Sequence, residues 1–185
     1  MLPLAFKLES VPVLVVGAGR VGARKAEQLI DAGATVTMIA ETFIEPAPPG
    51  VHRVEGRRYR RGDLRGFHLV VSATGDLGVN DEIVDEARDE RIWLNVVDDP
   101  DRSSFYFMAL HRQGEVTIAV TTEGAAPALA QEIRTLAAQR LPNNLAEVAA
   151  TLREERRAVH EQGASTEDVD WRTRIRELLG TDASR

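Results

Sequence analysis

Cysteine is absent from this chain of 185 residues, and lysine occurs only at Lys7 and Lys25. Without cysteine the chain can form no disulfide, no thiolate nucleophile and no cysteine metal site. The remaining basic residues are all arginines, whose planar guanidinium groups pair well with carboxylates and phosphates. We interpret most of them as solvated surface charges, which is the usual place for arginine.

Long hydrophobic runs and a basic surplus are also missing. The apolar run at residues 11–16 is far too short to span a bilayer, and residues 1–6 lack the basic start of a signal peptide. The net charge of −6 argues against non-specific nucleic-acid binding, which needs a basic face. We therefore expect a cytoplasmic protein that has neither a membrane nor a nucleic acid as its partner.

The first forty residues have the pattern of a strand, a helix and a second strand. Residues 13–16 are a continuous aliphatic run, which is typical of a strand buried on both faces of a parallel sheet. A glycine turn follows, and residues 21–32 have the apolar spacing of a helix that Gly33 would end. Residues 35–40 predict the second strand, which completes a βαβ unit.

The alternation of strands and helices continues to residue 97. Residues 51–54, 67–73 and 92–97 predict three more strands, and residues 79–88 predict a helix between the last two. The predicted fold class is therefore α/β, with a Rossmann-type doubly wound parallel sheet. Ligands of such sheets bind at the carboxyl ends of the strands.

The pattern changes after Asp98. Residues 105–110 and 116–121 look like an antiparallel pair of strands. Three helices are predicted after this pair, at residues 127–140, 145–159 and 171–179. A polar linker at residues 161–170 precedes the last of them. The sequence predicts three domains: a Rossmann domain at 1–112, a small α+β region at 113–144 and a small helical C-terminal domain at 145–185.

A glycine-rich turn follows the first predicted strand. Its spacing, from Gly17 through Gly19 to Gly22, is that of a dinucleotide-binding fingerprint, and it opens a helix, as that motif requires. Gly17 permits the tight turn, Gly19 lets the main chain approach a pyrophosphate, and Gly22 allows the helix to pack on the strand. Arg20 and Val21 would lie beside the cofactor. The alternative is a glycine turn that binds no ligand.

An acidic residue stands where the second predicted strand ends. Glu41 follows Gly22 by about twenty residues, the separation at which a carboxylate accepts hydrogen bonds from the adenosine ribose. A carboxylate there would repel a 2′-phosphate. The sequence therefore predicts NAD, rather than NADP, as the cofactor.

These residues belong to a longer ordered set of motifs. The set resembles the precorrin-2 dehydrogenase and sirohydrochlorin ferrochelatase family, which is the N-terminal module of sirohaem synthases. The matching residues run in order from Pro3 to about Pro142, and they are Pro3, Leu4, Phe6, 16–25, 32–37, 72–76, Val79, Asn80, 95–100, Phe105, 118–124 and 127–134.

The resemblance implies a homodimeric enzyme that oxidises precorrin-2 to sirohydrochlorin with NAD, with residues 113–144 as its dimerisation region. Asp98 matches the essential aspartate of the family. Because the reaction removes a hydride and a proton, we hypothesise that Asp98 is the general base. The alternative from the residues alone is that Asp98 and Asp99 cap a turn before Pro100.

Further site residues are also carried over from the resemblance. The expected cofactor contacts are Glu41 and Thr42 at one end, and Thr74, Asp76 and Asn80 on the nicotinamide side. Thr122 matches a serine near the tetrapyrrole cleft. The alternative, which is at least as good, is that its hydroxyl forms a hydrogen bond within the loop before the next helix. Arg134 is a candidate partner for substrate carboxylates. The arginines at residues 57–61 are interpreted as a solvated loop.

No metal site is expected. The four histidines, His52, His68, His111 and His160, have no metal-ligand spacing. Some family members also insert ferrous iron, and the resemblance would assign that step to Asp98 as well. The short helical tail favours a dehydrogenase alone.

Two other functions remain open. One is a non-catalytic NAD-sensing module of the kind attached to potassium transport systems, and the other is a small NAD-dependent dehydrogenase with a different substrate. Residues 95–100 and 121–124 favour the enzyme, because a sensor has no use for both segments.

Overall fold

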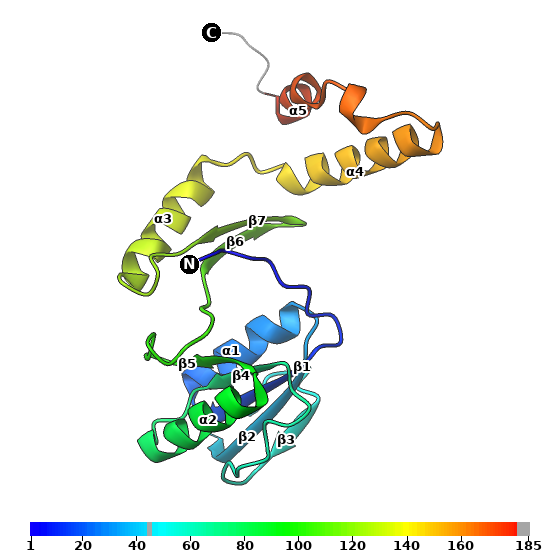
Figure 1. The fold of residues 1–185 in the computed structure, drawn as a ribbon. Coiled ribbons are helices and arrows are strands. Elements are labelled where there is room, and N and C mark those ends of the chain that lie inside the picture. Colours follow the sequence, from blue (N-terminus) through cyan, green and yellow to red (C-terminus); the bar gives the residue numbers. More distant parts are fainter. Residues whose placement is uncertain (44–45, 181–185) are drawn as a thin grey trace. The chain divides into compact units, whose positions relative to one another are not determined.

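The computed structural model describes residues 1–43 and 46–180 of the chain. The chain forms two compact units, Met1–Tyr106 and Phe107–Arg185, which are shown in Figure 1. The sequence placed the end of the Rossmann domain at residue 112, whereas the first unit ends at Tyr106. The reason is that the next strand pairs with a hairpin partner and not with the parallel sheet. The further division at residues 144 and 145 stays a prediction.

The first unit is built on a parallel sheet of five strands in the order β3-β2-β1-β4-β5. Its strands are β1 (Pro12–Ala18), β2 (Thr35–Phe43), β3 (Arg53–Glu55), β4 (Leu69–Ser72) and β5 (Trp93–Val96). The chain builds outward from β1 in one direction and then from β4 in the other. The predicted doubly wound Rossmann-type sheet is thus confirmed, and its switch point lies between β1 and β4.

Helices cover both faces of this sheet. Helix α1 (Arg20–Asp31) connects β1 to β2, and α2 (Leu77–Glu90) connects β4 to β5. Right-handed crossovers that run in opposite directions along a sheet place their helices on opposite faces. The strands between them are therefore buried on both sides, and Val13, Leu14 and Val15 have no exposed surface.

Several boundaries differ from the expected ones for local reasons. Helix α2 begins two residues before the predicted start because Asp76 caps it, accepting hydrogen bonds from the backbone N–H groups of Gly78 and Val79. Strand β3 lies slightly later than predicted because its pairing with β2 begins at Arg53. Strand β2 extends to Phe43, three residues beyond the predicted end.

The second unit consists of a hairpin and helices. Strands β6 (Ala109–Gln113) and β7 (Val116–Val120) are antiparallel. The remaining elements are α3 (Pro127–Arg140), α4 (Leu145–Glu161), a 3₁₀ turn at Thr166–Asp168 and α5 (Trp171–Leu179). Helix α3 packs against both strands. None of the helices in the described part of the chain has the length and apolar character needed to cross a membrane.

The first strand of the hairpin was predicted at residues 105–110, and that prediction was wrong. The sequence predicts a connection at residues 111–115. Strand β6 instead continues to Gln113, which pairs with Val116, the predicted first residue of the second strand, and Gly114 adopts a positive φ of 57° in a two-residue turn. Tight hairpin turns require this conformation, so the glycine fixes the register.

A buried glutamate ties the loop after β3 to α2. Glu86 is 2% exposed, and it accepts hydrogen bonds from the Tyr59 hydroxyl at 2.5 Å and from the backbone N–H groups of Gly62 at 2.8 Å and Leu64 at 3.1 Å. Burial and the contact with Glu86 raise the pKa of Tyr59, so its hydroxyl remains a donor. This carboxylate therefore fixes the position of the whole loop.

Replacing Glu86 with Ala should lower the free energy of unfolding by about 3 kcal/mol, because three buried donors lose their acceptor. Urea denaturation of the two proteins measures the difference. Glu82→Ala, on the exposed face of the same helix, is the control and should change stability by less than about 0.5 kcal/mol. Equal losses in the two variants would contradict the anchoring role.

Candidate active site

The predicted glycine turn lies against the end of β4. Gly17 has a φ of +103°, and a Cβ atom on it would lie 2.5 Å from the carbonyl oxygen of Ala73. No other residue type can adopt this φ without strain or approach the neighbouring main chain so closely. A Cβ on Gly22 would lie 2.1 Å from the carbonyl oxygen of Gly17, so a side chain there would require the turn to shift. The turn is therefore shaped by contact between main chains.

The start of α1 offers unused backbone donors. Gly19 is the N-cap residue, and no side chain caps the helix. The first bond inside the helix runs from the N–H of Ala23 to the carbonyl of Gly19 at 3.0 Å, so the N–H groups of Arg20, Val21 and Gly22 precede the helical ladder. Backbone donors at a helix start attract anions. This turn fits the pyrophosphate of a dinucleotide.

Glu41 and Thr42 lie near the end of β2, and both are exposed at the carboxyl edge of the sheet. The Glu41 carboxylate is already engaged. Its Oε2 atom lies 2.8 Å from Nε of Arg58, a residue of the loop after β3. The sequence had predicted Glu41 at this edge, but it gave no sign that an arginine from the 57–61 cluster would reach it.

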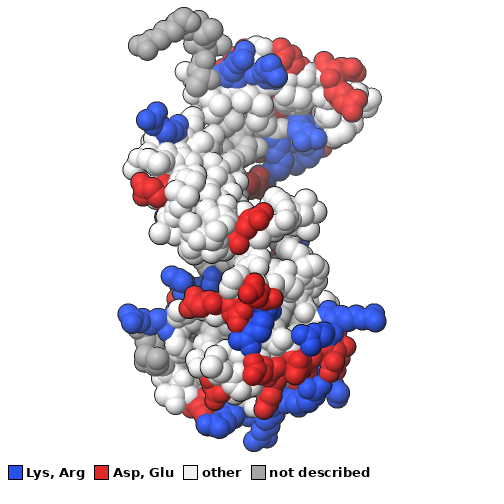
Figure 2. Space-filling model, turned by 60° about the vertical axis from the view of Figure 1, so that its left-hand side comes forward, with Lys and Arg blue, Asp and Glu red and all other residues white. Residues whose placement is uncertain are grey.

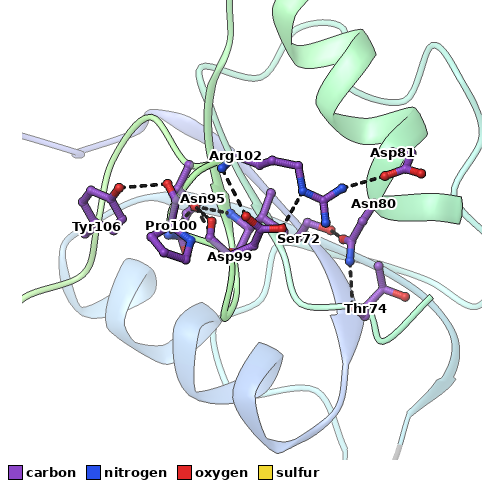
Figure 3. Close-up of polar contacts among 11 residues, drawn as sticks. Ser72, Thr74, Asn80, Asp81, Asn95, Asp99, Pro100, Arg102 and Tyr106 are labelled. Atoms are coloured by element: carbon purple, nitrogen blue, oxygen red, sulfur yellow. Dashed lines mark hydrogen bonds and ion pairs between the residues drawn. The ribbon is translucent and has the colours of Figure 1, made fainter. Parts of the chain in front are cut away.

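The residues predicted for the nicotinamide side make contacts within the protein, and those of Thr74 and Asn80 are drawn in Figure 3. Asp76 caps α2, and its own N–H donates to the Thr74 hydroxyl at 3.2 Å. Asn80 is buried; it accepts a hydrogen bond from the Ser72 hydroxyl at 2.6 Å and donates one to the Thr74 carbonyl at 3.3 Å. These contacts hold the turn between β4 and α2 in place. Direct contacts of Thr74, Asp76 and Asn80 with a cofactor stay predictions.

Asp98 occupies a special backbone position just past β5. The N–H of Asp99 donates to the Val96 carbonyl at 3.2 Å, which closes a turn around Val97 and Asp98. Asp98 has a φ of +60°, a conformation that aspartate tolerates better than most residues. Its side chain is exposed. Among residues 1–43 and 46–180, the Asp98 carboxylate has no recorded hydrogen bond.

The capping role that the sequence allowed for both aspartates belongs to Asp99. Its carboxylate accepts from the backbone N–H of Arg102 at 3.2 Å and from Nε of Arg102 at 2.5 Å. The Arg102 guanidinium also donates to Asp81 of α2 at 2.6 Å (Figure 3). Arg102 thus ties the Asp98 turn to the helix. Arg102 was not predicted as a site residue from the sequence, although its spacing of three from Asp99 is a signal for such a pair.

A cavity of about 370 Å³ lies where these segments meet. It brings together four predicted site residues, namely Val21, Thr74, Asn80 and Asp98. The other lining residues are Ala73, Gly75, Leu77, Val96, Val97, Asp99 and Arg102. Glu41 and Thr42 do not line it, because β1 separates β2 from β4 in the sheet.

Lys25 is a charged neighbour of Asp98 that the sequence alone did not single out. Burial, assisted by the charge of Arg24 and partly opposed by that of Asp98, lowers the pKa of Lys25 to about 8. Lysines with lowered pKa values beside a carboxylate are frequent in active sites. Helix α1 therefore contributes an ionisable group to the surroundings of Asp98.

The two residues predicted to contact the substrate belong to the second unit. The Thr122 hydroxyl accepts a hydrogen bond from the N–H of Ala126 at 3.1 Å, which is the loop role that the sequence allowed. Arg134 donates to the side chain of Gln131 at 3.2 Å. Contacts of Thr122 and Arg134 with a substrate stay predictions. Within the described ranges, no three His, Asp or Glu side chains gather as metal ligands would.

Comparison with known proteins relates most of the chain to one biosynthetic group. Residues 4–109 match the model of a family described as "Putative NAD(P)-binding". The siroheme synthase of Methylococcus capsulatus is 40% identical over 171 residues, which are 88% of this chain and 36% of that protein. The siroheme synthase of Tolumonas auensis is 35% identical over the whole chain and 36% of its own length.

The chain thus spans little more than a third of the curated relatives that it matches. A solved structure titled "SirC, precorrin-2 dehydrogenase" has a TM-score of 0.74 with 23% identity, and it covers 98% of this chain and 88% of that one. It shows that the two proteins share a fold. The siroheme synthase relatives confirm the resemblance predicted from the motifs. Since the family model covers more than half of the chain, including the glycine turn and Asp98, the chain belongs to this NAD(P)-binding family.

Proposed function

We propose that this chain oxidises precorrin-2 to sirohydrochlorin, with NAD as the oxidant. The observation that carries the proposal is the placement of Asp98, which lines a cavity together with Val21 of the glycine turn. The relatives of this chain are siroheme synthases, and the solved structure that shares its fold is a precorrin-2 dehydrogenase. The proposed reaction takes place in this cavity.

The residues at the carboxyl edge would hold the dinucleotide. The backbone N–H groups that follow Gly19 are suited to the pyrophosphate. Glu41 and Thr42 would contact the adenosine end of the dinucleotide, and the segment from Thr74 to Asn80 would border its nicotinamide end. Bound NAD would supply the acceptor for the hydride that leaves the substrate.

Oxidation of the tetrapyrrole also releases a proton, and we assign its removal to Asp98. Among the described residues, none forms a hydrogen bond with the exposed carboxylate of Asp98, so it is available to accept a proton from a substrate in the cavity. Asp99 and Arg102 hold the turn, so Asp98 is not needed as a structural cap.

We also propose that the chain acts as a homodimer through the hairpin and α3. Leu129, Ile133 and Leu136 of α3 and Leu110 of β6 are exposed. Figure 2, in which α3 is brought forward, shows a broad uncharged area on the second unit, whereas charges of both signs are densely interspersed on the first. Exposed apolar area of this kind marks interaction surfaces.

Substrate contacts of Thr122 and Arg134 and a cytoplasmic location stay predictions of the sequence, and iron insertion stays open as a second activity of the chain. Ferrous iron would be a substrate of that second reaction rather than a resident metal. The precursor carries several carboxylates, which arginine can bind with its planar fork.

The function is tested by incubating the protein with enzymatically prepared precorrin-2 and NAD while recording sirohydrochlorin absorbance and NADH formation. Both should rise together in the native protein. Asp98→Asn, which tolerates the same φ, should lower turnover on the order of a hundredfold or more, because loss of a general base has effects of that size. NAD affinity should be unchanged.

Asp101→Asn is the matched control, because Asp101 is an exposed carboxylate in the same loop. It should retain native turnover. An Asp98→Asn variant with full activity would overturn the assignment of the base, and a native protein that produces neither sirohydrochlorin nor NADH would overturn the function. A parallel reaction with ferrous iron reports whether sirohaem also forms.

The pH dependence of turnover should reveal the loss of the positive charge of Lys25. Below about pH 8 its ammonium is charged and attracts the Asp98 carboxylate; above that value the charge is lost. We therefore expect turnover to fall as pH rises through about 8. Lys25→Met should lack this alkaline inflection, and Lys25→Arg, which stays charged, should keep the rate measured at low pH. Identical pH profiles for the native protein and Lys25→Met would contradict this role.

The dimer is tested by sedimentation velocity. The native protein should sediment as a dimer at micromolar concentration, and Leu136→Arg should shift it to a monomer because a charge would be buried in the apolar interface. Val54→Arg, which places the same charge on the exposed strand β3 of the first unit, should leave the dimer intact. A native monomer would refute the proposal.

A further inference from the structure

Arg58 is distinguished from its neighbours by the partner that it takes. The loop after β3 contains several arginines, and three of them pair with residues of β3, of the loop itself or of α2. Arg57 binds Glu55 and Asp63, Arg61 binds Asp89, and Arg65 binds Glu90. Arg58 instead reaches Glu41 at the end of β2, with 2.8 Å between Nε and Oε2.

The guanidinium of Arg58 lies at the carboxyl edge of the sheet. Its pKa is raised first by the hydrogen bond and the charge of Glu41, and also by the charge of Asp76. Glu41 belongs to β2 and Asp76 follows β4, and β1 with its glycine turn lies between those two strands. Arg58 thus adds a positive charge to the region where the proposed function places the dinucleotide.

The backbone at Arg58 lies beside a buried anchor, whereas its side chain is exposed. The next residue, Tyr59, is buried and bonded to Glu86, which also holds Gly62 and Leu64. In contrast, the side chain of Arg58 is 70% exposed and that of Glu41 is 56% exposed. Exposed ion pairs contribute little stability. The guanidinium can therefore leave Glu41 with little loss of free energy and bind another anion.

Glu41 alone would select against NADP, because its carboxylate would repel the 2′-phosphate. The paired arginine changes this expectation. It neutralises the carboxylate, and its planar N–H donors match the oxygens of a phosphate. When NAD binds, Glu41 Oε1 remains available to the ribose hydroxyls while Arg58 stays on Oε2.

We propose that Arg58 is a nucleotide-specificity residue, which binds the 2′-phosphate of NADP and makes the site accept NADP as well as NAD. This inference rests on the proposed function, since it assumes that the dinucleotide lies at this edge. It gives one arginine of the 57–61 cluster a role beyond that of a solvated charge, and it adds NADP to the NAD predicted from Glu41.

Calorimetric titration of the protein with NAD and with NADP tests the proposal without any turnover. For the native protein, the two dissociation constants should agree to within about tenfold. Arg58→Ala should weaken NADP binding on the order of tenfold or more, the usual effect of losing a charge-assisted contact. It should change NAD binding by less than about threefold, because the pair with Glu41 is exposed. Glu41→Gln should strengthen NADP relative to NAD.

Arg61→Ala is the matched control. Arg61 belongs to the same loop and forms an equally exposed pair, with 60% and 61% of the two side chains exposed, but its partner Asp89 lies near the end of α2. This variant should bind both nucleotides as the native protein does. Raising the salt concentration should weaken NADP binding more than NAD binding in the native protein, and this difference should vanish in Arg58→Ala.

The outcomes separate this inference from the proposed function. If NAD binds but NADP binds more than about a hundredfold more weakly, or if Arg58→Ala weakens NADP no more than Arg61→Ala does, the inference is overturned and the proposed function stands. If the native protein binds neither nucleotide, the proposed function fails as well.

Discussion

The main chain of the glycine turn after β1 lies against the end of β4, where only glycine leaves enough space. A Cβ on Gly17 would come within 2.5 Å of the Ala73 carbonyl oxygen. This approach sets where α1 begins and leaves its first N–H groups without side-chain caps. It also brings the end of β4 beside that helix start, so that Val21 and Thr74 line the same cavity. The other features of the site are arranged around this contact.

Structural and chemical tasks are divided between neighbouring residues at this edge. Asp99 and Arg102 hold the turn after β5, and Asp98 remains available at a positive φ. Asp76 and Asn80 fix the start of α2, which stiffens the wall of the cavity. Sites that must position a reacting atom gain from such support, because small displacements of a catalytic group reduce the rate strongly.

The sequence predicted the parallel sheet well because periodicity and glycine spacing are local signals. The buried run of β1 and the spacing of Gly17, Gly19 and Gly22 were sufficient to place the dinucleotide edge, and Asp98 was located at that edge by its position after β5. The hairpin register was missed at Gly114, because a single residue in a positive-φ turn decides which residues pair.

Contacts between distant segments could not be predicted in the same way. Arg58 meets Glu41, and Arg102 meets Asp81, across separations that no periodicity encodes. Lys25 looked like an ordinary residue of a motif until its burial and the nearby charge of Asp98 were known. These residues show their roles only when the strand ends are gathered in space.

A crystal structure of the protein with bound NAD would test the central claim most directly. We expect the pyrophosphate on the N–H groups that follow Gly19, the adenosine beside Glu41, and the nicotinamide ring in the cavity with the Asp98 carboxylate facing it. A dinucleotide bound elsewhere, or an Asp98 carboxylate that points away from the ring, would contradict this account.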